Sequence, residues 1–176
     1  MAPLPRYQIR QILFAAGAVA IAVISITARL RPPAQPKSVI PDSDGGSFVN
    51  VDGASYHIGI RGNEAVIVFL HGFLSTARVW SRVIAQLNPR FRCISIDLPR
   101  FGRSAKGSSI PTGVWSRADW LHRMITTMET GPATIVGTSM GGQPALAFSR
   151  RYPEQVRNLV LIAPFVSKPP GYPSRS

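Results

Sequence analysis

After residue 47 the apolar and polar residues follow two patterns, and each pattern predicts a type of β-strand. Residues 48–52 and 55–61 alternate apolar with polar side chains around Asp52 and Gly53, which predicts a β-hairpin. Four further runs are mostly apolar, as is typical of strands buried on both faces of a sheet. These runs are residues 65–70, 92–96, 133–137 and 158–163.

Between these strands, apolar residues recur at helical spacing. Residues 77–87, 115–129 and 140–151 predict helices. The apolar face of the first helix consists of Val79, Trp80, Val83, Ile84 and Leu87. Strands that alternate with helices indicate an α/β fold, with a mostly parallel sheet and helices on both faces. The opening hairpin is expected at an antiparallel edge of that sheet.

An apolar segment without charge, residues 12–28, has arginines on both flanks. As a helix it would reach about 26 Å, close to the apolar thickness of a bilayer, about 30 Å. We therefore expect residues 1–30 to form a single-pass membrane anchor. A signal peptide, which would leave a secreted or periplasmic protein after cleavage, and a buried core helix are the alternatives.

The remaining organisation follows from composition. Residues 31–47 are rich in Pro, Gly, Ser and Asp, which predicts a linker without helix or strand. Residues 48–176 are expected to form one α/β domain. The only cysteine, Cys93, lies in an apolar run and is expected in the core.

The charge of the chain and the placement of its arginines limit the molecules that it is expected to bind. The chain of 176 residues holds 20 Lys and Arg against 8 Asp and Glu, a formal net charge of +12. The arginines are scattered and no nucleic-acid-binding module is recognisable, so we expect no nucleic-acid partner. No metal-ligand cluster, phosphate loop or dinucleotide fingerprint is visible, and we infer no metal and no cofactor.

The strongest chemical signal is residues 137–141, which read Gly-Thr-Ser-Met-Gly and match G-x-S-x-G. The motif follows a predicted strand and opens a predicted helix, which is the setting of a nucleophile elbow. Gly137 and Gly141 remove side chains that would clash in the tight turn, and Ser139 would stand at the helix N-terminus, where amides favour negative charge. We expect Ser139 to be a catalytic nucleophile; an ordinary glycine-rich turn is the alternative.

Two loops that follow predicted strands complete the candidate site. After residues 65–70 come His71, Gly72 and Phe73. The N–H groups of Phe73 and Met140 could form an oxyanion hole. His71 could serve as a general base, but we favour a structural role in which its hydrogen bonds shape the loop. Asp97, after residues 92–96, could be a catalytic acid; we favour hydrogen bonds to loop amides.

Taken together, these motifs resemble the α/β-hydrolase superfamily, and within it the enzymes that carry a separate cap domain. The matching residues are 71–73, 79–80, 97–104, 136–142, 150–156 and 158–164. The resemblance implies a serine hydrolase of esterase or lipase type that acts on a small-molecule ester or a similar carbonyl substrate. It also implies Ser139 as the nucleophile and Phe73 and Met140 as the oxyanion residues.

The chain departs from the family pattern in two ways. Arg100 replaces the first glycine of D-x-x-G-x-G-x-S. In the family an acid and a histidine follow the nucleophile, but after Ser139 this chain has no histidine and one acid, Glu154, at a surface position of the family. We therefore expect a hydrolase fold incomplete at its C-terminal end, without the acid and histidine of the triad. The chain is expected to be a fragment of an enzyme or a short, vestigial, membrane-tethered protein.

Overall fold

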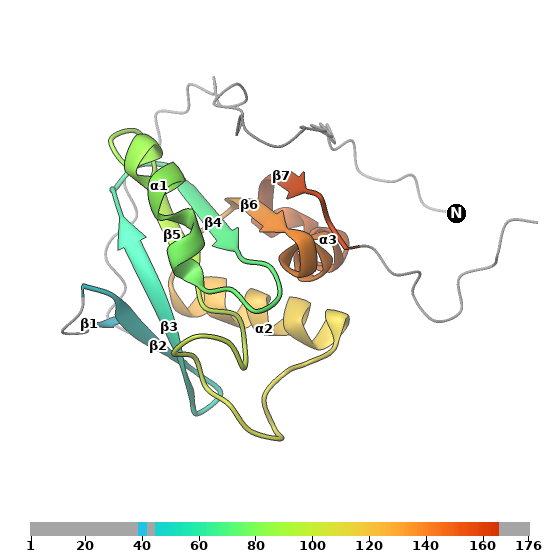
Figure 1. Ribbon diagram of the computed structural model, residues 1–176. Coiled ribbons are helices and arrows are strands. Elements are labelled where there is room, and N and C mark those ends of the chain that lie inside the picture. Colours follow the sequence, from blue (N-terminus) through green and yellow to red (C-terminus); the bar gives the residue numbers. More distant parts are fainter. Residues whose placement is uncertain (1–38, 42–44, 166–176) are drawn as a thin grey trace, which may run out of the picture.

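The apolar runs of the sequence become the strands of one sheet. The computed structural model describes residues 39–41 and 45–165 (Figure 1). Within them, seven strands lie in the order β1-β2-β3-β5-β4-β6-β7. The strands are β1 (Val39–Pro41), β2 (Ser47–Val51), β3 (Ala54–Arg61), β4 (Val66–Leu70), β5 (Arg92–Ile96), β6 (Ala133–Thr138) and β7 (Val156–Ile162).

Three α-helices and three short 3₁₀ helices connect the strands of the described chain. The α-helices are α1 (Ser81–Leu87), α2 (Val114–Thr127) and α3 (Gly142–Arg151). The 3₁₀ helices are η1 (Ala77–Trp80), η2 (Ser139–Gly141) and η3 (Pro153–Gln155). No helix of the described chain has both the length and the apolar character needed to cross a bilayer. The predicted membrane segment, residues 12–28, lies outside the described residues.

The predicted hairpin is confirmed, and the sheet extends beyond it. Strands β2 and β3 pair antiparallel, and Asp52 and Gly53 at their turn both have positive φ, 54° and 77°, which this tight connection requires. Strand β1 pairs antiparallel with β2. The prediction that residues 31–47 contain no strand is therefore wrong at 39–41 and at Ser47, where β2 begins. The β-branched Val39 and Ile40 favour a strand, and an edge position tolerates Pro41.

The other four strands form the parallel part of the sheet. Strands β5, β4, β6 and β7 lie side by side and parallel, whereas β3 joins β5 antiparallel. Every residue of β4 and β5 is buried, as the continuous apolar runs predict. Cys93 in β5 is fully buried, and burial raises the pKa of its thiol to about 12, so this cysteine is part of the core.

Helices cover both faces of the sheet, as predicted (Figure 1). On one face, Trp80 and Ile84 pack on Ile67 and Phe69, with 5.1 Å between the ring centroids of Trp80 and Phe69. On the other face, α2 and α3 contribute a larger cluster. Its members include Trp120, Leu121, Met124, Ile125 and Phe148. Val79, predicted on the buried face, is 56 % exposed because η1 replaces the first α-helical turn and changes the phase of the side chains.

Chain order creates a switch point beside β4. From β4 the chain passes through α1 to β5 on one side, then through α2 to β6 on the other side of β4. In open parallel sheets, ligands bind at the carboxyl ends of strands where the order reverses in this way. The loops after β4 and β6 therefore meet at the place where a site is expected.

The loop after β5 keeps a glycine-type backbone conformation at Arg100, the residue that departs from the family pattern. Arg100, which stands where the family pattern has glycine, has a φ of 74°, and its N–H donates to the carbonyl of Ala105 at 3.0 Å. The hydrogen bond keeps the glycine-type turn although the residue has a side chain. A left-handed conformation costs a residue with a Cβ about 1–2 kcal/mol.

We expect Arg100→Gly to raise the free energy of unfolding by about 1 kcal/mol, because it relieves this strain. Urea denaturation measures the change. Arg100→Ala keeps the Cβ and the strain and is the matched control, for which no such gain is expected. Equal stability of the two variants would contradict this explanation.

Candidate active site

Ser139 occupies a sharp turn between a buried strand and a helix. It follows β6, begins η2, and has a φ of 48°, in the left-handed region that residues with a side chain rarely adopt. Its side chain is exposed, although β6 is buried up to Gly137. Backbone strain of this kind costs of order 1–3 kcal/mol and is concentrated at functional sites. The turn thus holds one hydroxyl at the carboxyl edge of the sheet.

The two motif glycines allow the turn to be this tight. A Cβ on Gly137 would lie 2.5 Å from the carbonyl oxygen of Gly141. A Cβ on Gly141 would lie 2.5 Å from the carbonyl oxygens of Leu70 and His71. These neighbours are backbone atoms, so they cannot rotate away as a side chain could. The turn therefore packs directly against the end of β4.

The end of β7 holds the same turn from the other side. The N–H of Phe165 donates to the carbonyl of Ser139 at 3.0 Å, and Thr138 Oγ1 donates to the carbonyl of Ile162 at 3.2 Å. A Cβ on Gly142 would lie 2.7 Å from Pro164 Cβ. Backbone contacts from β4 and from the residues after β7 thus fix the position of Ser139.

The loop after β4 lies beside Ser139. A Cβ on Gly72 would be 3.3 Å from Ser139 Cβ and 3.9 Å from Ser139 Oγ. Phe73, the next residue, is 65 % exposed, and its ring stands edge-on to Phe101 at 5.9 Å. Met140, directly after Ser139, lies in the short 3₁₀ turn that leads into α3. The structure thus brings the predicted serine and the two predicted oxyanion residues to one edge of the sheet.

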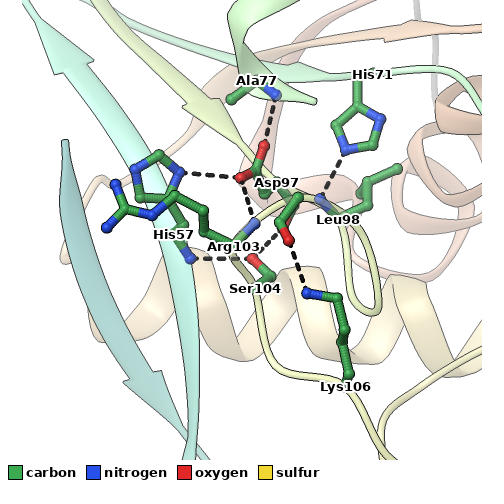
Figure 2. Close-up of polar contacts among 9 residues, drawn as sticks. His57, His71, Ala77, Asp97, Leu98, Arg103, Ser104 and Lys106 are labelled. Atoms are coloured by element: carbon green, nitrogen blue, oxygen red, sulfur yellow. Dashed lines mark hydrogen bonds and ion pairs between the residues drawn. The ribbon is translucent and has the colours of Figure 1, made fainter. Parts of the chain in front are cut away.

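His71 is a fully buried loop residue whose two ring nitrogens are both engaged. Its Nε2 accepts the N–H of Leu98 at 3.0 Å (Figure 2), which requires the proton on Nδ1. Nδ1 then donates to the carbonyl of Gly72 at 2.7 Å. Burial lowers the pKa of His71, which keeps the ring neutral. The ring therefore ties the loop after β4 to the loop after β5 and leaves no nitrogen for Ser139.

Asp97 links three parts of the chain, as Figure 2 shows. Its carboxylate accepts the N–H groups of Ala77 at 2.6 Å and Arg103 at 3.0 Å, and it lies 3.0 Å from Nδ1 of His57. Its carbonyl accepts from Ser104 Oγ, which in turn accepts the N–H of His57. The prediction that Asp97 satisfies loop amides is confirmed. The pairing with His57 was not predicted, because strand alternation alone does not show which loop a side chain meets.

The other two histidines also lie away from Ser139. His57 is on β3, three strand positions from β6, which corresponds to about 14 Å. His122 stacks on Tyr152 with ring centroids 4.0 Å apart, beyond the C-terminus of α3, about 15 Å from its start. All three histidines belong to the described chain, and none is placed to accept a proton from Ser139. In the same residues no three potential metal ligands gather.

The buried state of His71 predicts a pH dependence of stability. Because its pKa is lower in the folded protein than in the unfolded chain, the unfolded chain binds more protons below about pH 6.5. The free energy of unfolding should therefore fall as the pH drops through this range, by at most about 1.4 kcal/mol per pH unit from this group. His71→Gln, which takes up no proton, should lose this part of the slope. Denaturant titrations between pH 5 and 8 measure it, and identical slopes for the two proteins would contradict the assignment.

Comparisons with known proteins agree with this architecture. A family model described as alpha/beta hydrolase fold matches residues 65–174. Pimeloyl-[acyl-carrier protein] methyl ester esterase of Nitrosomonas europaea is 34 % identical over 110 residues, 62 % of this chain and 41 % of that protein. A 2-hydroxy-6-oxononadienedioate/2-hydroxy-6-oxononatrienedioate hydrolase of Burkholderia vietnamiensis is 41 % identical over 109 residues, 57 % of this chain and 36 % of that protein.

A solved structure gives the same result. The crystal structure of Cfl2 from Burkholderia cenocepacia superposes with a TM-score of 0.67 at 27 % identity, over 78 % of this chain and 49 % of that one. The chain spans less than half the length of each of these three relatives. The matched segment contains β4 to β7, the turn at Ser139 and the loops that surround it. The chain belongs to the α/β-hydrolase fold family.

Proposed function

We propose that this chain carries the nucleophile and oxyanion hole of a serine hydrolase that acts on an ester or a similar carbonyl. Ser139 is the nucleophile. The observation that carries the proposal is the strained, exposed conformation of Ser139 beside Gly72. Relatives named as a methyl ester esterase and as a hydrolase support the reaction class.

The proposed reaction begins with attack of Ser139 Oγ on the carbonyl carbon. The carbonyl oxygen becomes an oxyanion, which the N–H groups of Phe73 and Met140 stabilise. One such donor contributes about 3 kcal/mol to transition-state stabilisation. Collapse of the intermediate breaks the ester C–O bond, and the leaving alkoxide takes up the proton of the Ser139 hydroxyl and departs as the alcohol. Water then hydrolyses the acyl group on Ser139 and releases the carboxylic acid. Gly72 matters here because its lack of a side chain leaves room for the substrate carbonyl next to Ser139.

A general base for Ser139 is not found among the described residues. None of the chain's three histidines is placed to reach Ser139, and both nitrogens of His71 are occupied. Without a base, Ser139 is an ordinary weak alcohol. The oxyanion hole and substrate binding alone leave about 10³–10⁴-fold acceleration over water. We therefore propose that the chain alone is a poor catalyst, and the alternative is a hydrolase-like protein without catalysis.

Membrane attachment is a separate proposal. Residues 12–28 are apolar, free of charge and flanked by arginines, which supports a tether to a bilayer. The residues up to 38 would then connect this tether to the sheet. The proposal concerns location only, and the chemistry of Ser139 does not depend on it.

Labelling with a fluorophosphonate probe tests the proposed nucleophile. We expect slow modification, after long incubation with excess probe, that mass spectrometry locates on Ser139 and that Ser139→Ala abolishes. Ser81→Ala, which removes another exposed serine at the start of a helix, should leave labelling unchanged. Turnover of p-nitrophenyl acetate should be weak and depend on Ser139.

Two results would contradict the proposal. Labelling that persists in Ser139→Ala would show that the reactive group lies elsewhere, and no labelling at all would favour the non-catalytic alternative. Turnover at the rate of an intact esterase would contradict the absence of a base.

A further inference from the structure

A buried arginine without an anionic partner lies on α2, the helix that follows the loop after β5. Arg117, in the first turn of α2, is only 8 % exposed. Its Nε is enclosed and has no hydrogen-bond partner, and no ion pair or hydrogen bond within the described chain involves its guanidinium. Burying a charge without a partner is costly, and such groups are normally paired. The described chain thus offers the Arg117 guanidinium an aromatic ring but no anion.

Contacts through one aromatic ring connect Arg117 to the loop beside Ser139. The guanidinium carbon of Arg117 lies 5.7 Å from the ring centroid of Phe101. The same ring stands edge-on to His71 at 5.5 Å and to Phe73 at 5.9 Å. Phe73 follows Gly72, where an added Cβ would lie 3.3 Å from Ser139 Cβ. The cation therefore shares a neighbour with the proposed oxyanion loop.

The surroundings of Arg117 add positive charge and do not neutralise it. Burial lowers the pKa of Arg117, and the nearby Arg100 guanidinium lowers it further. Helix α2 has no acidic residue in its first turn and no side-chain cap at Gly113. The N-terminus of a helix carries partial positive charge, and helical side chains lean toward it. The carboxylate of Asp97 already accepts two loop amides and pairs with His57.

Other arginines of the described chain differ from Arg117 in their partners or in their place in the fold. On the same helix, Arg123 pairs with Asp52 at 2.5 Å, and on α3, Arg151 pairs with Asp119 at 3.0 Å. Two other arginines also have an enclosed nitrogen without a partner, Nη1 of Arg92 and Nε of Arg157. They lie at the starts of β5 and β7, whereas Ser139 follows the end of β6. Arg117 is thus the buried, unpaired arginine that lies on the side of the candidate site.

We propose that Arg117, assisted by Arg100 and the first-turn amides of α2, binds a carboxylate of the substrate, so that the hydrolase acts on esters that carry a free carboxylate. A planar guanidinium matches a carboxylate in a bidentate pair, and removal of the pair from water strengthens it. The substrate anion would supply the partner that the described chain lacks. The inference rests on the proposed function for its place in catalysis, but binding of the anion does not require turnover.

Binding measurements on a non-reacting variant test the proposal. In the Ser139→Ala background, isothermal titration should show that monomethyl glutarate binds at least tenfold more tightly than dimethyl glutarate, which lacks the charge. Arg117→Met should remove this preference. Arg123→Met, on the same helix and paired at the surface, should keep it. Loss of Ser139 labelling would refute the proposed nucleophile alone, because these titrations do not depend on that serine.

Thermal stability separates a binding role from a packing role. If Arg117 is an anion-binding residue, Arg117→Met should raise the melting temperature of the free protein, because the substitution removes an unpaired buried charge. A lower melting temperature with an unchanged monoester preference would overturn the proposal, as would equal affinity of the starting protein for the two esters. If Arg117→Met does not fold, Arg117→Lys decides: a preference reduced at least threefold supports the site, and an unchanged preference overturns it.

Discussion

Close contact between the turn after β6 and the end of β4 is the constraint on which the site depends. Gly141 lies so near the carbonyl oxygens at the end of β4 that a single Cβ would collide with them. The same approach brings Gly72 against Ser139. Because β4 is buried throughout and β6 is buried up to this turn, the serine has little freedom to leave its strained conformation. The chemistry proposed for this chain is therefore a consequence of backbone packing at one edge of a parallel sheet.

Much of this geometry could be predicted from the sequence, for physical reasons. Continuous apolar runs define strands buried on both faces, and a glycine-flanked serine between such a run and a helix defines the turn at Ser139. The loop positions of Phe73 and Asp97 follow from the strands that precede them. The family pattern also indicates the backbone conformation at Arg100, because the backbone there has the positive φ that the family glycine would adopt.

Long-range side-chain contacts could not be predicted in the same way. The pairing of His57 with Asp97 joins β3 to a loop 40 positions later in the chain, and no local pattern indicates it. Arg117 lies on a helix whose spacing shows an apolar face but not that a cation is buried within that face. Strand β1 was missed because Pro and Ser around it suggested a linker. In each case contacts between distant parts of the chain decided the outcome, not the composition of the segment.

A crystal structure of the fluorophosphonate-treated chain would show whether Ser139 and the two backbone amides act together. We expect phosphorus bonded to Ser139 Oγ, with the phosphoryl oxygen about 3 Å from the backbone nitrogens of Phe73 and Met140. Such a structure would show that the turn presents the serine and that the two loops stabilise an oxyanion. An adduct whose phosphoryl oxygen points away from both amides, or a Ser139 that has relaxed to a negative φ, would contradict this expectation.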